Sequence, residues 1–265
     1  MSTRTFLVHG LVAGLLAGIA AFVVAYTVGE PQIDKAVALE EAARAPASDG
    51  HDHDHAGSEE TGHSHDDEDA VVTRDTQSTW GLATGTLAIG VVLGGLTGLL
   101  AAVGLGRLGG LRPWASTALV ALLGAVSFSI VPFLKYPATP PAVGSGETID
   151  HRTALYFGFL AVSVLGVLAA VAVARAAARR WSGVPGVVAG AATYVVVVSV
   201  AALAFPKVDE LGDFPAGILW DFRVASLLTL LAMWAVIGAV LTVLVDRACR
   251  QHGAVQARRE LAASL

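Results

Sequence analysis

Six long apolar runs, separated by polar segments, dominate the pattern of the chain. At about 1.5 Å per helical residue, a run of about 20 residues crosses the hydrocarbon core of a bilayer. We therefore predict an all-α fold: a polytopic integral membrane protein with about six transmembrane helices in a single membrane domain over residues 1–265. The predicted spans are about 6–28, 81–106, 114–134, 153–174, 183–205 and 224–245.

The first two runs carry small residues at a regular spacing. Each contains three glycines four residues apart: Gly10, Gly14, Gly18, Gly90, Gly94 and Gly98. Such stripes let the backbones of two membrane helices approach closely. Arg4 gives the first run a positive start like that of a signal peptide, but the run is longer than a usual signal sequence and lacks a small-residue cleavage site. We expect it to be retained.

Three polar segments break the pattern. Residues 32–44 have helical propensity and could form a short amphipathic segment at the membrane surface. Residues 45–78 form a loop that we expect to be disordered, since the stretch 50–69 contains no hydrophobic residue larger than alanine. In residues 131–153, four prolines fall within ten residues, and each removes a donor and restricts its predecessor. We therefore predict that 131–153 is not regular helix.

Composition supports a membrane protein and limits its partners. Only 15% of the residues are charged, against about 25% in soluble domains, so we expect the lipid bilayer to surround the chain. The net charge of −5 is not typical of nucleic-acid binding. The single cysteine, Cys249, excludes an intramolecular disulfide framework and a CxxC motif, and we interpret it as an incidental thiol.

The distribution of basic residues predicts the orientation. The N-terminus, the turns at 107–112 and 175–180 and the C-terminal tail hold ten of the 17 Lys/Arg residues but only two acidic residues. The positive-inside rule therefore places both termini in the cytoplasm, in a multi-pass protein of the cytoplasmic membrane, with the loop at 45–78 outside.

A histidine-rich tract within that loop is the first candidate for chemistry. Five of the eight histidines lie within fifteen residues, among many carboxylates. Imidazole and carboxylate groups suit cobalt, nickel, zinc and copper, although a polar spacer could have the same composition. A mobile chain pays ordering entropy when it binds, which favours weak capture and release. The candidate ligands are His51, Asp52, His53, Asp54, His55, His63 and His65.

Polar residues at the span boundaries are the second candidate, because such groups often mark a transport path. The set is Lys135, Glu147, Asp150, His151, Arg152, Asp221 and Arg223. Interface anchoring is the alternative, with an ion pair between Asp221 and Arg152 or Arg223. For His9, an interhelical hydrogen bond is the favoured interpretation over a metal ligand. The chain has no GxxxxGK[ST] loop, so we expect no nucleotide, and no nucleophile–base or rigid metal constellation that would indicate an enzyme.

Three stretches resemble one known family. The runs VPFLKYPATPPAVGSGETIDHRTALY (131–156) and FPAGILWDFRVASLLTLLAMW (214–234), with the opening GLVAGLLAGIAAF followed by GEPQID, are similar to the CbtA family. These are proposed cobalt transporter subunits linked to cobalamin supply and often accompanied by a small membrane partner, CbtB. The matching residues are Pro132, Tyr136, Pro137, Pro140, Pro141, Arg152, Pro215, Trp220, Phe222 and Arg223.

The resemblance and the candidate residues together predict uptake of divalent cobalt. The histidine tract would capture the ion, which would then pass the proline-rich outer loops and a glycine-lined helix interface. The path candidates are Tyr136, Pro137, Pro140, Pro141, His151, Arg152, Asp221 and Arg223. Two features depart from the family: six spans where five are usual, and a histidine-rich segment that usually belongs to the partner. Transport of nickel, zinc or copper is one alternative, and a non-transporting metal-binding scaffold or sensor is another.

Overall fold

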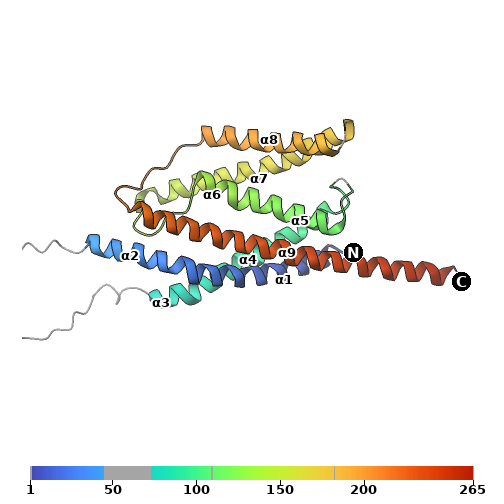
Figure 1. Cartoon of the computed structure of the whole chain (residues 1–265), viewed down its shortest axis with the longest axis horizontal. Helices are drawn as coiled ribbons and strands as arrows, with labels where there is room; N and C mark the ends of the chain where they lie inside the picture. The colour runs from blue at the N-terminus through green and yellow to red at the C-terminus, as the bar shows by residue number, and fades with distance from the viewer. Residues whose placement is uncertain (1, 45–72, 109, 182, 265) are drawn as a thin grey trace, which may run out of the picture.

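The computed structural model describes residues 2–44, 73–108, 110–181 and 183–264. In this part of the chain all regular structure is helical, and the long helices run side by side along one axis (Figure 1). The elements are α1 (Thr3–Val24), the π-helical turn η1 (Ala25–Gly29), α2 (Glu30–Arg44), α3 (Arg74–Thr76), the π-helical turn η2 (Gln77–Gly81), α4 (Leu82–Gly104), α5 (Pro113–Gly124), the π-helical turn η3 (Ala125–Ile130), α6 (Val131–Lys135), the 3₁₀ turn η4 (Gly146–Thr148), α7 (Ile149–Arg180), α8 (Gly183–Ala204) and α9 (Ala216–Ala263).

Six helical stretches of the described chain are long and apolar enough to cross a membrane, which confirms the predicted fold class and number of helices. They are Thr3–Ala43, Arg74–Gly104, Pro113–Lys135, Gly146–Arg180, Gly183–Ala204 and Ala216–Ala263. Large apolar side chains remain on their outer surfaces, for example Leu203 at 88% and Val184 at 76% exposure. In a bilayer these side chains face lipid, so exposing them carries no hydrophobic cost.

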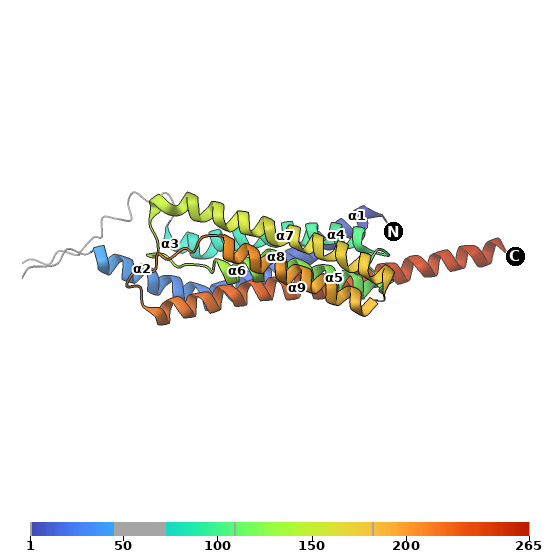
Figure 2. The same ribbon diagram turned by 90° about the horizontal axis from the view of Figure 1, so that it is seen from above.

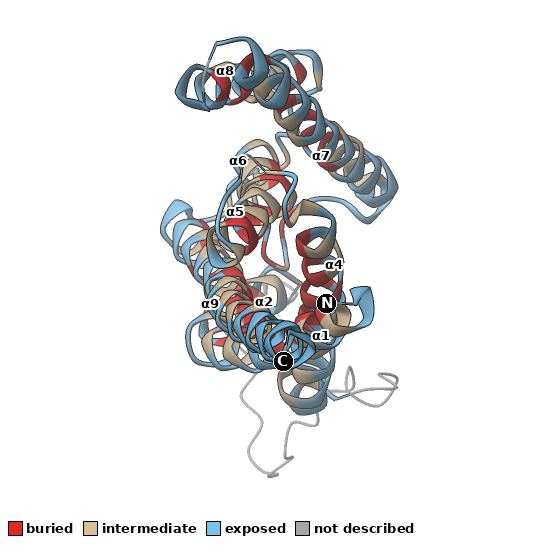
Figure 3. Cartoon of the chain, turned by 90° about the vertical axis from the view of Figure 1, so that its right-hand side faces the viewer, coloured by how far each residue is buried: buried red, intermediate tan, exposed pale blue. Residues whose placement is uncertain are grey.

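Helix α9 is the centre of the larger part of the bundle. Helices α1 and α5 pack against it, and α4 packs against α1. The side chains of Ile237, Leu241 and Val245 on α9 are fully buried in these contacts. Helices α7 and α8 form a hairpin that stands apart from this group, and α7 joins it through η3 and α6 (Figure 3). The last part of α9 extends past the bundle (Figure 2).

The glycine stripes of α1 and α4 are close-packing faces, as the spacing predicted, and the structure shows that they face each other. A Cβ at Gly14 would collide with the carbonyl oxygen of Gly90, and one at Gly10 would collide with the carbonyl oxygen of Gly94. The backbones therefore touch along the whole interface. This packing corrects the expected passage of an ion along the glycine-lined interface, because the two helices themselves fill that space.

Two prolines lie inside continuous helical stretches, and the segment 131–153, predicted not to be regular helix, is helical at both of its ends. Pro132 lies in α6, directly after η3, and Pro31 lies in α2, directly after η1. A proline lacks the N–H that would bond to the carbonyl four residues earlier. In both stretches a π-helical turn, in which the hydrogen bonds span five residues instead of four, comes just before the proline. Residues 149–152 are also helical, as the start of α7. Irregular chain remains mainly between Lys135 and Gly146.

The segment 32–44 is helical as expected, but it is not separate from the first span. Helix α2 continues α1 through η1, so that one helical stretch runs from Thr3 to Ala43. The end of the bundle that carries α2, α3 and the two irregular loops before α7 and α9 is called the cavity end below. The end that carries Thr3 and the α4–α5 and α7–α8 turns is called the opposite end (Figure 1).

Candidate functional site

A cavity of about 1050 Å³ opens at the cavity end of the bundle. Its wall combines the α1–α2 junction, the irregular chain after α6, the start of α7, the loop before α9 and the first turns of α9. These segments are far apart in the sequence, and only the bundle brings them together.

Six of the eight predicted path residues line this cavity: Tyr136, Pro137, Pro140, Pro141, Arg152 and Arg223. The other two, His151 and Asp221, are exposed on the first turns of α7 and α9 and are not part of the wall. Each directly precedes a residue that does line the cavity, Arg152 or Phe222. Because successive residues of a helix point about 100° apart, His151 and Asp221 point away from it.

The proline-rich loop is tied to the end of α8. The Nζ atom of Lys135 donates to the carbonyl oxygens of Ala202 at 2.8 Å and Phe205 at 3.0 Å. These carbonyls belong to the last turn of α8, where no further helical N–H can reach them and where the helix dipole attracts a cation. The Tyr136 hydroxyl donates to the carbonyl oxygen of Pro206 at 2.8 Å. Burial raises the pKa of Tyr136, which keeps the phenol protonated as a donor.

An ion pair joins the two loops of the cavity wall. The Nε atom of Arg152 lies 3.4 Å from Oε2 of Glu210, and its terminal nitrogen donates to the carbonyl oxygen of Ser145 at 3.2 Å. Glu210 Oε2 also accepts from the Thr148 hydroxyl at 2.9 Å. At Gly144, φ is +92°, and a side chain there would collide with the Arg152 guanidinium. The predicted pairing of Asp221 with Arg152 is therefore wrong, because Arg152 contacts Glu210.

The second arginine predicted as a partner of Asp221 also has another contact. Arg223 Nε donates to the carbonyl oxygen of Ala138 at 3.5 Å, which fixes the proline-rich loop to α9. Both arginines therefore donate to carbonyl oxygens of irregular backbone and hold it in place around the cavity.

One residue of the cavity wall was missed in the sequence. Glu30, at 8% exposure, is the one charged residue of the described part that is buried. Its carboxylate accepts from the guanidinium of Arg74 at the start of α3, which also donates to Asp34 Oδ1 at 3.0 Å. Two carboxylates thus share one arginine beside the cavity. The position of Glu30 at the end of an apolar run, just before Pro31, was the available signal.

The metal ligands predicted in the histidine tract cannot be located in the structure. His51, Asp52, His53, Asp54, His55, His63 and His65 lie outside the described residues. Within the ranges that the structure does describe, no three His, Cys, Asp or Glu side chains lie close enough to hold a metal ion together. His9 does not make the expected hydrogen bond through Nδ1, which is buried without a partner among the described residues.

Fold and cavity together define a class: a multi-pass α-helical membrane protein whose irregular loops enclose a mainly apolar cavity with a few charged side chains at one end of the bundle. The sequence model of the CbtA family, described as "Probable cobalt transporter subunit", matches residues 3–246, nearly the whole chain. The chain therefore belongs to the CbtA family. The family's description is that of a transporter subunit, and the word subunit implies a partner. No curated protein and no solved structure matches the chain.

Proposed function

We propose that this protein takes up divalent cobalt across the cytoplasmic membrane in support of cobalamin synthesis. The observation that carries the proposal is the cavity wall, since seven of the ten residues named for the family resemblance line it. Pro137, Pro140 and Pro141 form its irregular part, and Arg152 and Arg223 hold that part in place.

The wall of the cavity holds three cationic side chains, Lys135, Arg152 and Arg223, against the two carboxylates of Glu30 and Glu210, so the proposed entry of a cation depends on the acidic side formed by Glu30 and Asp34. Glu30 and Asp34 carry two negative charges against the single positive charge of Arg74, while Arg152 and Glu210 compensate each other. Lys135 is held by carbonyl oxygens of α8. A carboxylate oxygen is a good ligand for Co²⁺. Glu30, which lines the cavity, is the residue that we propose to contact the ion.

The histidine-rich tract is proposed as the collector that feeds this cavity. Both of its attachment points lie at the cavity end: α2 ends at Arg44, and α3 begins at Arg74, which contacts Glu30. Ions released from the tract would therefore enter the cavity directly. The proposal places this end outside the cell and both termini in the cytoplasm, in line with the positive-inside rule. A small partner of the CbtB type completes the proposed transporter.

Cobalt accumulation in cells that lack other cobalt importers tests the proposal. The intact protein should raise cellular cobalt at trace external concentration, and deletion of residues 50–69 should raise the half-saturating concentration without abolishing uptake. Equal uptake by both forms would show that the tract is not a collector. If neither form raises cobalt, even with the small partner present, cobalt uptake is excluded.

Liposomes that contain the purified protein separate transport from a scaffold or sensor role. A transporter should give a cobalt flux, alone or with its partner, whereas a scaffold gives none. His and Asp ligands do not distinguish cobalt from nickel, zinc or copper. The flux of each of these metals into the same vesicles therefore establishes which metal is carried.

A further inference from the structure

The cavity of about 1050 Å³, called the large cavity below, has two basic side chains without an acidic partner among the described residues, Lys135 and Arg223. Each donates to backbone carbonyl oxygens instead. Arg223 does so through Nε, at 3.5 Å, and within the described chain its two terminal nitrogens have no hydrogen-bond partner. A guanidinium group is a planar fork that suits two oxygens of a phosphate or carboxylate. This side of the wall therefore suits an anionic group.

Charged and apolar side chains line the large cavity at different depths. Arg152 and Arg223 lie near the starts of α7 and α9, at the cavity end. Farther along the same helices, Phe157 on α7 and Leu230 on α9 belong to the wall. At a rise of 1.5 Å per residue, they lie about 7–10 Å beyond the arginines along the helix axes. A ligand that matches this wall has an anionic head and an apolar tail.

The large cavity is accessible from the side of the bundle. Helix α7 supplies one wall, and η1 and α9 supply walls on the other side. The α7–α8 hairpin stands apart from the rest of the bundle (Figure 3). Phe157 is 59% exposed although it lines the cavity, and it lies in a helical stretch that is long and apolar enough to cross a membrane. In a bilayer this ring faces lipid, so an acyl chain reaches the wall without leaving the membrane.

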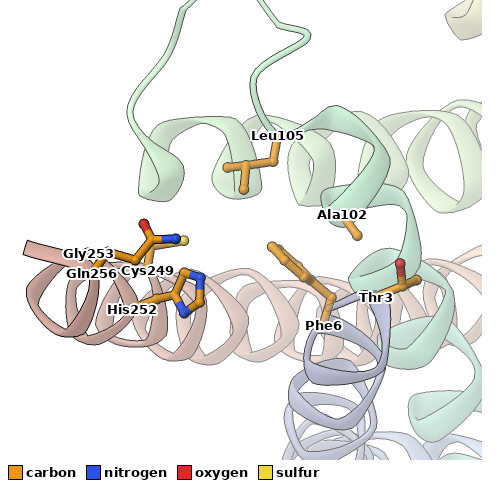
Figure 4. A pocket seen from close by; sticks show the side chains of 8 residues that line it. All are labelled: Thr3, Phe6, Ala102, Leu105, Cys249, His252, Gly253 and Gln256. Atoms are coloured by element: carbon orange, nitrogen blue, oxygen red, sulfur yellow. The ribbon is translucent and has the colours of Figure 1, made fainter. Parts of the chain in front are cut away.

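A smaller cavity at the opposite end has a different character. Its volume is about 330 Å³, and Phe6, Leu105 and His252 are among the residues that line it (Figure 4). In the described chain, no lysine or arginine belongs to its wall. The basic charge is therefore specific to the large cavity and is not shared by this one.

We propose that the large cavity binds an anionic phospholipid, with its phosphate on Arg223 and Lys135 and an acyl chain along Phe157 and Leu230. Basic pockets between membrane helices bind the head groups of anionic lipids in this way. The phosphate offsets the positive side of the wall and leaves the acidic side, with Glu30, to the ion. The lipid site does not rest on the proposed function, since its occupancy is measured without cobalt.

Native mass spectrometry of the purified full-length protein in detergent, titrated with phosphatidylglycerol, tests the site. The half-saturating concentration should lie at least about tenfold below that of phosphatidylcholine, which carries no net charge. Arg223→Gln should raise the value for phosphatidylglycerol about tenfold or more, because charge-assisted hydrogen bonds to the phosphate are lost. Lys207→Gln removes an exposed charge at the same end, outside the cavity wall, and should leave the value unchanged.

Equal binding of the two lipids by the intact protein would overturn the proposal without any substitution. So would unchanged binding in an Arg223→Gln variant that elutes as the same species. Glycerol phosphate separates a lipid from a soluble anion, because it has the head group without acyl chains. It should not displace the lipid at millimolar concentration, and displacement would reject the lipid as the ligand. Bound lipid in a protein that takes up no cobalt would reject the proposed function and leave the site.

Discussion

Glu30 is the single residue whose environment differs most from what its sequence position suggests. It follows an apolar run and precedes a proline, yet the structure buries it in the cavity wall with Arg74 as its partner. A buried carboxylate in a membrane protein needs a partner charge, and such residues are functional candidates by default.

Glu30→Gln tests this residue directly. Loss of a charged contact to the ion is worth about 1.5–3 kcal/mol, which corresponds to a rise of roughly ten- to a hundredfold in the half-saturating cobalt concentration. Cellular uptake at trace cobalt measures it. Asp75→Asn, an exposed acidic residue beside Arg74, is the matched control and should behave as the unchanged protein. Equal kinetics in both variants would remove Glu30 from the path.

The histidine tract makes a prediction about pH. Imidazole binds metal only when it is neutral, so affinity should be full above the histidine pKa of about 6.5 and fall as the pH drops through it. Titration of a synthetic peptide of residues 50–69 with cobalt at pH 7.5 and pH 5 measures the change. Equal affinity at the two values would show that the histidines are not the ligands.

At the scale of elements, the packing of α1 on α4 depends on backbone contact. A Cβ at Gly94 would collide with the carbonyl oxygen of Gly10, whereas one at Gly85, on the same helix, would meet nothing within 4 Å. The spacing of four indicated a packing face in both helices, but it could not show that the two faces pack against each other rather than against other helices.

Gly94→Ala should therefore destabilise the protein by about 1–3 kcal/mol, because the added methyl group forces the helices apart. Gly85→Ala should be neutral or slightly stabilising, since alanine restricts the unfolded chain. The unfolding midpoints of the two variants in detergent measure the difference. Similar midpoints would contradict the close contact of α1 and α4.

The loops of the cavity wall depend on the pair of Arg152 and Glu210. Arg152→Glu or Glu210→Arg alone places like charges together and should reduce both stability and uptake, whereas the double exchange should recover part of each. A coupling energy of about 0.5–3 kcal/mol is expected from a double-mutant cycle. Full recovery is not expected, because Glu210 also accepts from Thr148 and the exchanged arginine cannot. Additive effects would show that the pair is not coupled.

At the scale of the whole molecule, the orientation in the membrane decides whether the cavity end faces the outside. Gly146→Cys and Ser264→Cys, each in a Cys249→Ser background, place single thiols at the cavity end and near the C-terminus. A membrane-impermeant maleimide added to whole cells should label the first and not the second. The reverse pattern would invert the proposed direction. A side chain at Gly146 meets nothing within 4 Å, so the change should not disturb the loop.

Local patterns in the sequence were sufficient for the fold class, the number of spans and the glycine faces. Length and hydropathy act over consecutive residues, and a bilayer requires helices of that length, so these features follow without knowledge of tertiary contacts. The prolines of 131–141 also identified the irregular wall of the cavity, although the position of Pro132 within a helix depended on the preceding π-helical turn.

The partners of the polar residues were decided by the tertiary structure alone. The sequence analysis named Asp221 as a partner for Arg152, but the partner in the structure is Glu210, in a different loop that the bundle brings against it. Glu30 meets Arg74 for the same reason, across the chain between α2 and α3. Charge pairing is set by distances in space, which one-dimensional patterns do not contain.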